Sequence, residues 1–164
     1  MRDEDGFAPI LDLDAARAWR EQQRANGQRV VSTNGCFDLL HAGHVAYLAW
    51  ARAQGDALIL LLNDDASVRT LKGPQRPLVG FADRARVLSA LRSVDAIVGF
   101  AERSPERVLE VLAPDVHVKS AQYRIDELPE RYVVERGGGR IVLAPHQPGR
   151  STTDLVAAIR TPQR

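Results

Sequence analysis

Short apolar segments alternate with helix-forming segments along most of this chain. Segment 57–62 is apolar at every position, which is typical of a strand in a parallel sheet that is covered on both faces. Segments with apolar residues at helical spacing end at turn residues such as Gly27 and Gly55, which predicts helices between the strands. We expect strands at 29–32, 57–62, 96–98, 116–118 and 141–143, and helices at 12–26, 43–54, 81–93, 104–112, 127–135 and 152–159.

This regular order of strands and helices predicts the fold class. Strands that alternate with helices are typical of an open sheet with helices packed on both faces. We therefore expect a single-domain, Rossmann-like, doubly wound α/β fold with a mainly parallel, five-stranded sheet. Ligands of such folds bind beyond the carboxyl ends of the strands, so the loops that follow the strands are the places to search for chemistry.

The composition narrows the class of protein further. A chain of 164 residues with 45% hydrophobic and 26% charged residues fits a globular domain and excludes collagen-like, disordered and membrane-spanning classes. Lys and Arg (22) nearly balance Asp and Glu (21), so we expect neither nucleic acid nor membrane as a partner. Cys36 is the single cysteine and no apolar leader opens the sequence, which favours a cytoplasmic protein.

The loop after the first predicted strand carries the richest chemistry, and it reads Asn34-Gly35-Cys36-Phe37-Asp38-Leu39-Leu40-His41-Ala42-Gly43-His44. Gly35 and Gly43 let the backbone approach a ligand, and the start of the next helix suits a phosphate group. His41 and His44 are three residues apart, so both can face one side and donate to phosphate oxygens. The alternatives are histidines that cap a helix or face solvent, and a zinc site with Cys36 that lacks a fourth ligand.

Further short motifs follow this loop in order: Gly55-Asp56, residues 63–67, Leu71-Lys72-Gly73, Arg76-Pro77, Arg84, Val94-Asp95 and residues 149–153. Together with His-x-Gly-His at 41–44, they make the chain resemble the cytidylyltransferase-like nucleotidyltransferase superfamily over residues 28–160. Within that superfamily it looks most like the adenylyltransferase domains of ADP-heptose synthases, which activate D-glycero-β-D-manno-heptose 1-phosphate. The resemblance implies a lead-in and helix at 1–27 and a nucleotidyltransferase domain at 28–164. Its expected reaction moves AMP from ATP to a sugar 1-phosphate and releases pyrophosphate.

The resemblance also implies a role for each matching residue. The expected catalytic residues are His41, His44 and Lys72. The expected nucleotide-binding residues are Gly35, Cys36, Phe37, Gly43, His44, Ser151, Thr152 and Thr153, and the expected substrate-binding residues are Asn34, Asp38, Asn63, Asp65, Arg76, Arg84, Lys119 and Gln122. Magnesium is the expected cofactor, held by phosphate oxygens and water, with no metal site made by the protein. The expected partners are a nucleoside triphosphate, a sugar phosphate and a second copy of the chain in a homodimer.

Arg84 has a structural alternative that follows from its position. It falls on the core-facing stripe of the predicted helix 81–93, where a guanidinium needs an anionic partner. That partner is either a ligand phosphate or a carboxylate such as Asp38. The segment from Leu71 to Pro77 likewise predicts either a loop that closes over a triphosphate or a solvated surface loop.

Two other motifs have capping alternatives. Ser151 and Thr152 lie at the start of the last predicted helix, where hydroxyl groups commonly cap the helix and could alternatively bind phosphate oxygens. Asn63 and Asp65 follow the second predicted strand, where they belong either to a ligand site or to the start of a short helix.

The chain departs from the family pattern after the fourth predicted strand. The family shows Lys-Gly-x-Asp and an aromatic residue, whereas this chain reads Lys119-Ser120-Ala121-Gln122-Tyr123. The loss of the glycine and of the carboxylate bears on which sugar and which base are bound. Two alternatives therefore stay open: a cytidylyltransferase that uses CTP and a polyol phosphate or phosphonate, and a nucleotide-binding regulator without turnover.

Overall fold

The computed structural model describes residues 2–145. The predicted helix at 152–159 and the candidate nucleotide-binding residues Ser151, Thr152 and Thr153 lie outside the described residues.

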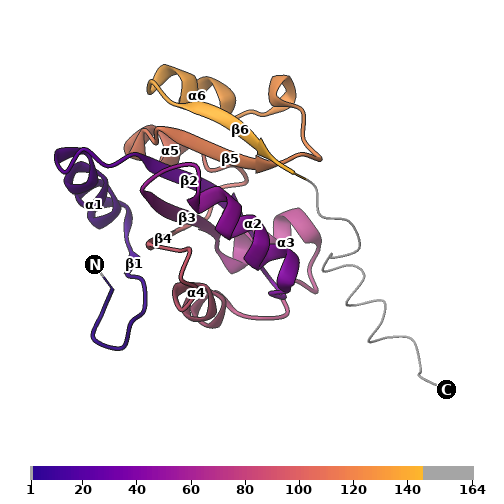
Figure 1. The fold of residues 1–164 in the computed structure, drawn as a ribbon. Helices are drawn as coiled ribbons and strands as arrows, with labels where there is room; N and C mark the ends of the chain where they lie inside the picture. The colour runs from indigo at the N-terminus through magenta and orange to yellow at the C-terminus, as the bar shows by residue number, and fades with distance from the viewer. Residues whose placement is uncertain (1, 146–164) are drawn as a thin grey trace.

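A single parallel sheet organises the described chain (Figure 1). Its strands are β1 (Ile10–Leu11), β2 (Val30–Gly35), β3 (Ala57–Asn63), β4 (Ala96–Phe100), β5 (Val116–Ser120) and β6 (Arg140–Ala144). The spatial order is β1-β4-β3-β2-β5-β6, and every neighbouring pair is parallel. The strand order reverses between β2 and β5, and in doubly wound folds ligands bind in the crevice at that reversal.

The prediction of five strands was wrong, because the sheet has six. The additional strand is β1, which pairs with β4 at one edge of the sheet. It contains only two residues, Ile10 and Leu11, too few to show a periodicity. Tertiary contact stabilises it instead, since the amide nitrogen of Ala8 donates to the Ser89 carbonyl and that of Ile97 to the Pro9 carbonyl.

The helices among the described residues are α1 (Leu13–Ala25), α2 (Ala42–Arg52), the short α3 (Asp65–Lys72), α4 (Phe81–Ser89), α5 (Glu106–Leu112) and α6 (Arg131–Arg136). Five of the predicted helices are present among the described residues, with shifts at their ends, and a sixth, the short α3, lies where only the capping alternative for Asn63 and Asp65 placed a helix. The two largest shifts are four residues each: the helix predicted at 81–93 ends at Ser89, and the one predicted at 127–135 begins late. There a 3₁₀ turn (Ile125–Glu127) comes first and the α-helix begins only at Arg131.

The strand residues pack against helices on both faces of the sheet, as predicted for a doubly wound fold. All seven residues of β3 are buried. Alternate residues Leu58, Leu60 and Leu62 pack with side chains of α2 and α4, whereas Ile59 and Leu61 pack with those of α1, α5 and α6. A strand buried on both faces accounts for the apolar run in the sequence.

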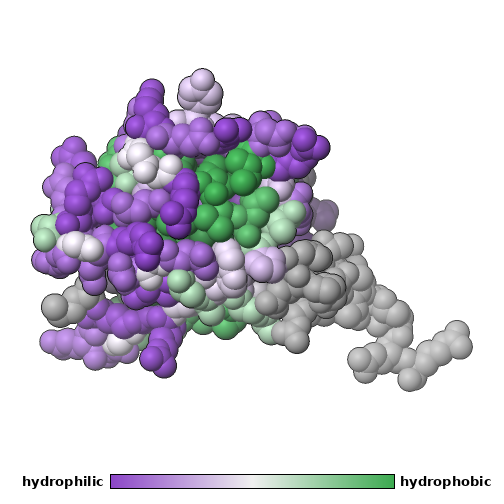
Figure 2. All heavy atoms as spheres, turned by 45° about the horizontal axis from the view of Figure 1, so that its top comes forward, coloured by the Kyte–Doolittle hydropathy of each residue, from purple (hydrophilic) through white to green (hydrophobic). Residues whose placement is uncertain are grey.

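The outer surface is mainly hydrophilic on the face drawn in Figure 2, where hydrophobic residues gather in one patch. In the part of the chain that the structure describes, no helix has the length and apolar character needed to cross a membrane.

Candidate active site

A strained turn follows β2 and sets the position of the first histidine loop. Phe37 has a φ of 45°, in the left-handed region that a bulky residue rarely adopts. Its ring lies so close to Gly35 that a Cβ on Gly35 would come within 2.7 Å of it, so only glycine fits there. The Phe37 ring in turn contacts the His44 ring, with 5.0 Å between the ring centroids. The turn therefore packs an aromatic side chain against a candidate catalytic residue.

His41 and His44 face the same side, as their spacing predicted. Their rings stack with centroids 3.8 Å apart and planes inclined by 24°. His41 is the N-cap of α2, and its Nδ1 accepts a hydrogen bond from the Gly43 amide at 3.1 Å. One amide of the expected phosphate cradle is thus bonded to His41 in this structure.

The backbone just before the histidine pair offers hydrogen-bond donors. Within residues 2–145, the amide nitrogens of residues 37–40 donate no hydrogen bond. Consecutive amides without a protein acceptor make a concave donor surface for an anion. The donor surface and the two imidazoles together form the candidate phosphate-binding element.

His44 is uncharged at neutral pH. Burial and, second, the neighbouring His41 lower the pKa of His44 from 6.5 to about 4, against the opposing effect of the Leu39 carbonyl. Its Nδ1 is buried and has no hydrogen-bond partner in the described part of the chain. A buried polar atom without a partner is typical of a functional site, where a ligand supplies the missing hydrogen bond.

This low pKa predicts a pH-dependent stability. Between pH 6.5 and about 4 the unfolded chain binds a proton at residue 44 that the folded chain does not, so the free energy of unfolding decreases as pH falls through this window. Above pH 6.5 the contribution is fully present. After solvent screening we expect a loss of about 1–2 kcal/mol. Urea unfolding of wild type and His44→Gln at pH 7.5 and pH 4.5 measures it, and an equal decrease in both proteins would contradict the assignment to His44.

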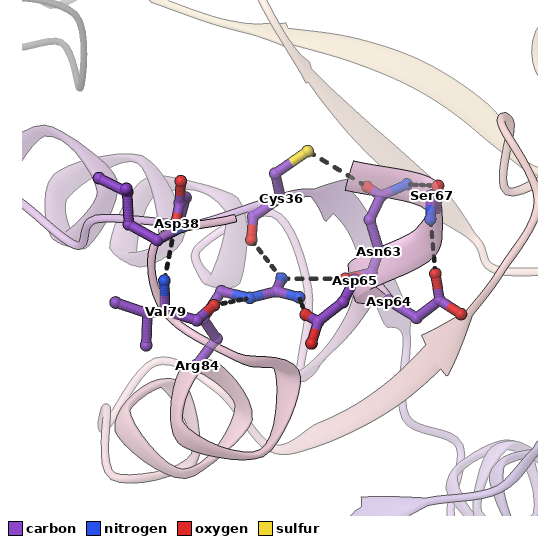
Figure 3. Close-up of polar contacts among 9 residues, drawn as sticks. Cys36, Asp38, Asn63, Asp64, Asp65, Ser67, Val79 and Arg84 are labelled. Atoms are coloured by element: carbon purple, nitrogen blue, oxygen red, sulfur yellow. Dashed lines mark hydrogen bonds and ion pairs between the residues drawn. The ribbon is translucent and has the colours of Figure 1, made fainter. Parts of the chain in front are cut away.

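Arg84 is a buried side chain that links the ends of β2 and β3 through hydrogen bonds (Figure 3). It is 2% exposed, and its Nη1 donates to the carbonyls of Cys36 at 2.6 Å and Asn63 at 2.9 Å. Its Nε donates to the Val79 carbonyl at 2.9 Å and its Nη2 pairs with Asp65 at 2.7 Å. The carboxylate alternative is therefore the one present in the structure, with Asp65 as the partner in place of Asp38.

Asp38 instead holds the loop that carries Arg76. Its Oδ2 pairs with Arg76 Nη1 at 2.6 Å, and its Oδ1 accepts from the amides of Leu78 at 2.7 Å and Val79 at 3.0 Å. The Asp38 side chain is 8% exposed. The segment before α4 is thereby tied to the loop after β2, as Figure 3 shows for Asp38 and Val79.

Asn63 points into the protein, where it orders the end of β3. It is buried, its Nδ2 donates to Ser67 Oγ at 2.8 Å, and its Oδ1 lies 3.9 Å from Cys36 Sγ. Asp64, rather than Asp65, caps α3 by accepting from the Ser67 amide at 2.7 Å. The capping alternative thus describes this turn.

Three further candidates, Lys72, Lys119 and Gln122, differ in their contacts with the other candidate residues. Lys72 ends α3 on the surface, and its charge lowers the pKa of the Cys36 thiol against the larger raising effect of burial. Lys119 is the penultimate residue of β5, and its Nζ donates to Asn34 Oδ1 at 2.9 Å, across the reversal of strand order. Gln122 is exposed and forms no hydrogen bond with residues 2–145.

The sequence analysis missed Glu130, the buried carboxylate that pairs with Lys119 at 2.7 Å. The predicted helix placed it in mid-helix, whereas it is the N-cap of α6. A lysine at the inner end of a buried strand requires a counter-charge, and this requirement was the available signal.

No group of three His, Cys, Asp or Glu side chains among residues 2–145 is arranged to hold a metal ion. The imidazoles of His41 and His44 stack on each other, and Cys36 faces Asn63.

A parallel sheet with a histidine loop beside its reversal of strand order defines an α/β domain with its ligand site at the carboxyl edge. The chain belongs to the cytidylyltransferase-like family, whose model matches residues 32–158.

Curated relatives of similar sequence carry the name bifunctional protein HldE. The chain is 49% identical over 157 residues to HldE of Geotalea uraniireducens and 51% identical over 157 residues to HldE of Gluconacetobacter diazotrophicus. The alignments cover 96% and 94% of this chain but 32% of each relative. The chain therefore spans about a third of the length of these relatives.

Solved structures with this fold include a lipopolysaccharide core biosynthesis protein from Thermoplasma volcanium. It aligns with a TM-score of 0.62 and 24% identity over 74% of this chain and 98% of its own. A pantoate-beta-alanine ligase from Francisella tularensis aligns with a TM-score of 0.60 and 12% identity over 92% of this chain and 76% of its own. At these identities the similarity concerns the fold.

Proposed function

We propose that this chain transfers AMP from ATP to a heptose 1-phosphate and releases pyrophosphate. Membership of the cytidylyltransferase-like family and about 50% identity to HldE proteins support nucleotidyl transfer. The resemblance of its motifs to those of ADP-heptose synthases supports the base and the sugar. The proposal also locates the enzyme in the cytoplasm, where nucleoside triphosphates are available.

The observation that carries the proposal is the stacked pair of imidazoles at the reversal of strand order, beside amides of residues 37–40 that have no acceptor within residues 2–145. In the proposed reaction an oxygen of the sugar phosphate attacks the α-phosphorus in line. A new P–O bond forms as the bond to the β-phosphate oxygen breaks, so pyrophosphate leaves without a protein nucleophile. Catalysis then consists of positioning and of charge stabilisation on the phosphate oxygens.

Each group has a role that matches its chemistry. His44, uncharged at neutral pH, donates one ring N–H to the transferring phosphate, and the approach of an anion raises its affinity for a proton. His41 stacks on His44 and adds a second imidazole to the site. Lys72 contributes an exposed charge toward the β- and γ-phosphates, together with Ser151 and Thr152.

Arg84 has a different place in the proposal from the one that the resemblance implied. Four of its five N–H donors are bonded to protein acceptors in this structure. Contact with the acceptor phosphate through Arg84 stays a prediction, and Arg76 at the neighbouring loop is the better exposed guanidinium for that contact.

Magnesium fits this site as a companion of the nucleotide. It would neutralise charge on the phosphate oxygens and be held mainly by those oxygens and by water, because the described residues form no carboxylate cluster. The chain's own residues bind and orient the substrates.

The decisive experiment measures pyrophosphate release with ATP, CTP, GTP or UTP against a panel of phosphorylated acceptors. The proposal predicts turnover with ATP and heptose 1-phosphate. Preference for CTP with a polyol phosphate or phosphonate would favour the cytidylyltransferase alternative. Tight nucleotide binding without pyrophosphate release for any acceptor would favour a regulator and contradict the proposal.

A further inference from the structure

A buried ion pair lies directly beneath the reversal of strand order. Lys119 at the end of β5 is 8% exposed, and Glu130 at the start of α6 is 2% exposed. Lys119 Nζ lies 2.7 Å from Glu130 Oε1 and donates to Asn34 Oδ1 at 2.9 Å. The ring of Tyr123 covers the ammonium, with its centroid 4.9 Å from Nζ. The cation is thus fixed by three neighbours from different segments of the chain.

His117 lies on the buried side of this ion pair. His117 is fully buried, its Nδ1 lies 2.8 Å from Ser32 Oγ, and its Nε2 lies 3.9 Å from Glu130 Oε1. Burial by itself would raise the pKa of Glu130, but His117 and the Lys119 ammonium outweigh it and hold this pKa at about 2. Glu130 is therefore ionised at every pH at which the enzyme is expected to work.

The ion pair decides which way the Asn34 amide points. An ammonium only donates hydrogen bonds, so the atom of Asn34 that faces it must be the carbonyl oxygen. The Nδ2 group of Asn34 therefore points the other way. It makes no hydrogen bond with residues 2–145, and Asn34 is only partly buried at the carboxyl end of β2. Two oriented N–H donors are thus presented where ligands of this fold bind.

We propose that Glu130 is a positioning residue, which holds Lys119 against Asn34 so that the Asn34 amide donates to an oxygen of the sugar phosphate. The inference rests on the proposed function. Lys119 is charge-neutralised by Glu130, so its main effect on the substrate is exerted through Asn34. Glu130 belongs to none of the recognised motifs of the chain, and it supplies a carboxylate near a segment in which Gln122 replaces the acidic residue of the family pattern.

Glu130→Gln tests this role because it keeps the size of the side chain and removes its charge. We expect the KM for the sugar phosphate to rise roughly tenfold, since one oriented hydrogen bond is weakened. The KM for ATP and kcat should change by less than about threefold. The weakened hydrogen bond would stabilise the bound acceptor equally in the ground state and in the transition state. Glu135→Gln is the matched control, since it breaks the exposed Arg131–Glu135 pair at 2.7 Å on the same helix. It should leave all three constants unchanged.

A double variant separates positioning from stability. Glu130→Gln alone leaves a buried ammonium without its counter-charge, which destabilises the fold. Lys119→Met with Glu130→Gln removes both charges, so thermal unfolding should return toward the wild-type temperature while the KM for the sugar phosphate stays raised. Recovery of the wild-type KM in the folded double variant would overturn the inference.

An NMR measurement that needs no turnover tests the orientation of Asn34 independently of the proposed function. The side-chain NH₂ resonances of Asn34, assigned with Asn34→Asp, should shift in Glu130→Gln and stay unchanged in Glu135→Gln. Unmoved resonances, or an unchanged KM for the sugar phosphate in folded Glu130→Gln, would overturn the positioning role. If the wild-type protein releases no pyrophosphate with any sugar phosphate, the proposed function is refuted. The NMR resonances then still test whether Glu130 orients the Asn34 side chain.

Discussion

His44→Ala lowers kcat for pyrophosphate release by roughly 10²–10³-fold, the usual effect of removing one donor to a transition-state oxygen. The neutral imidazole of His44 has an unpartnered buried nitrogen and lies between the rings of His41 and Phe37. In the proposed reaction its loss removes a fixed donor from the reacting phosphate, and it leaves a small space at the start of α2. Turnover is measured with saturating ATP and sugar phosphate, and folding by circular dichroism and thermal unfolding.

The matched control for His44→Ala is Val45→Ala on the next residue of the same helix. Val45 is 41% exposed, so its truncation changes neither the core nor the site, and we expect kcat within about twofold of wild type. Near-normal kcat in folded His44→Ala would remove His44 from the catalytic residues. An equal decrease in Val45→Ala would attribute the effect to the helix rather than to the imidazole.

Arg84→Met destabilises the protein by about 3–5 kcal/mol, the range for removing one partner of a buried, hydrogen-bonded charge. The carbonyls of Cys36, Asn63 and Val79 lose their donor, and Asp65 loses its counter-charge. Such unsatisfied groups cost more than the apolar surface of methionine restores. Urea unfolding at pH 7.5 measures the loss as a shift of the midpoint.

Arg84→Lys should recover only part of this stability, because one ammonium cannot reach four acceptors in the geometry of a guanidinium. Arg86→Met is the control on the same helix, where the side chain is 53% exposed and its pair with Asp3 is long, at 3.9 Å. We expect a change below about 1 kcal/mol there. A similarly small change in the free energy of unfolding of Arg84→Met would show that the hydrogen bonds of Arg84 do not stabilise the ends of β2 and β3.

Much of the fold could be predicted from local patterns. The apolar segment of β3 and the helix after the histidine loop were found because periodicity and capping are properties of neighbouring residues. The edge strand β1 was missed because two residues have no period, and its pairing with β4 depends on the finished sheet. The start of α6 was misplaced for a similar reason, since Glu130 takes part in a buried ion pair instead of continuing a helix.

The candidate site, like the fold, could be predicted from the sequence only in part. The spacing of His41 and His44 was sufficient to predict that they face one side. The burial of Arg84 followed from the helical stripe, but the carboxylate named as its possible partner was Asp38, and residue type alone could not distinguish Asp38 from Asp65. The structure pairs Asp65 with Arg84 and Asp38 with Arg76, because the loops after β2 and β3 bring each carboxylate to a different arginine.

The sequence alone therefore determined the alternation of the five longer strands with helices, and it indicated that His41 and His44 face one side. These depend on interactions between residues close together in the chain. The tertiary structure decided the edge strand, the partners of Arg84 and Asp38, and the ion pair of Lys119 with Glu130 that orients Asn34. Those contacts join residues far apart in the chain, and only the packing of the sheet and its helices brings them within bonding distance.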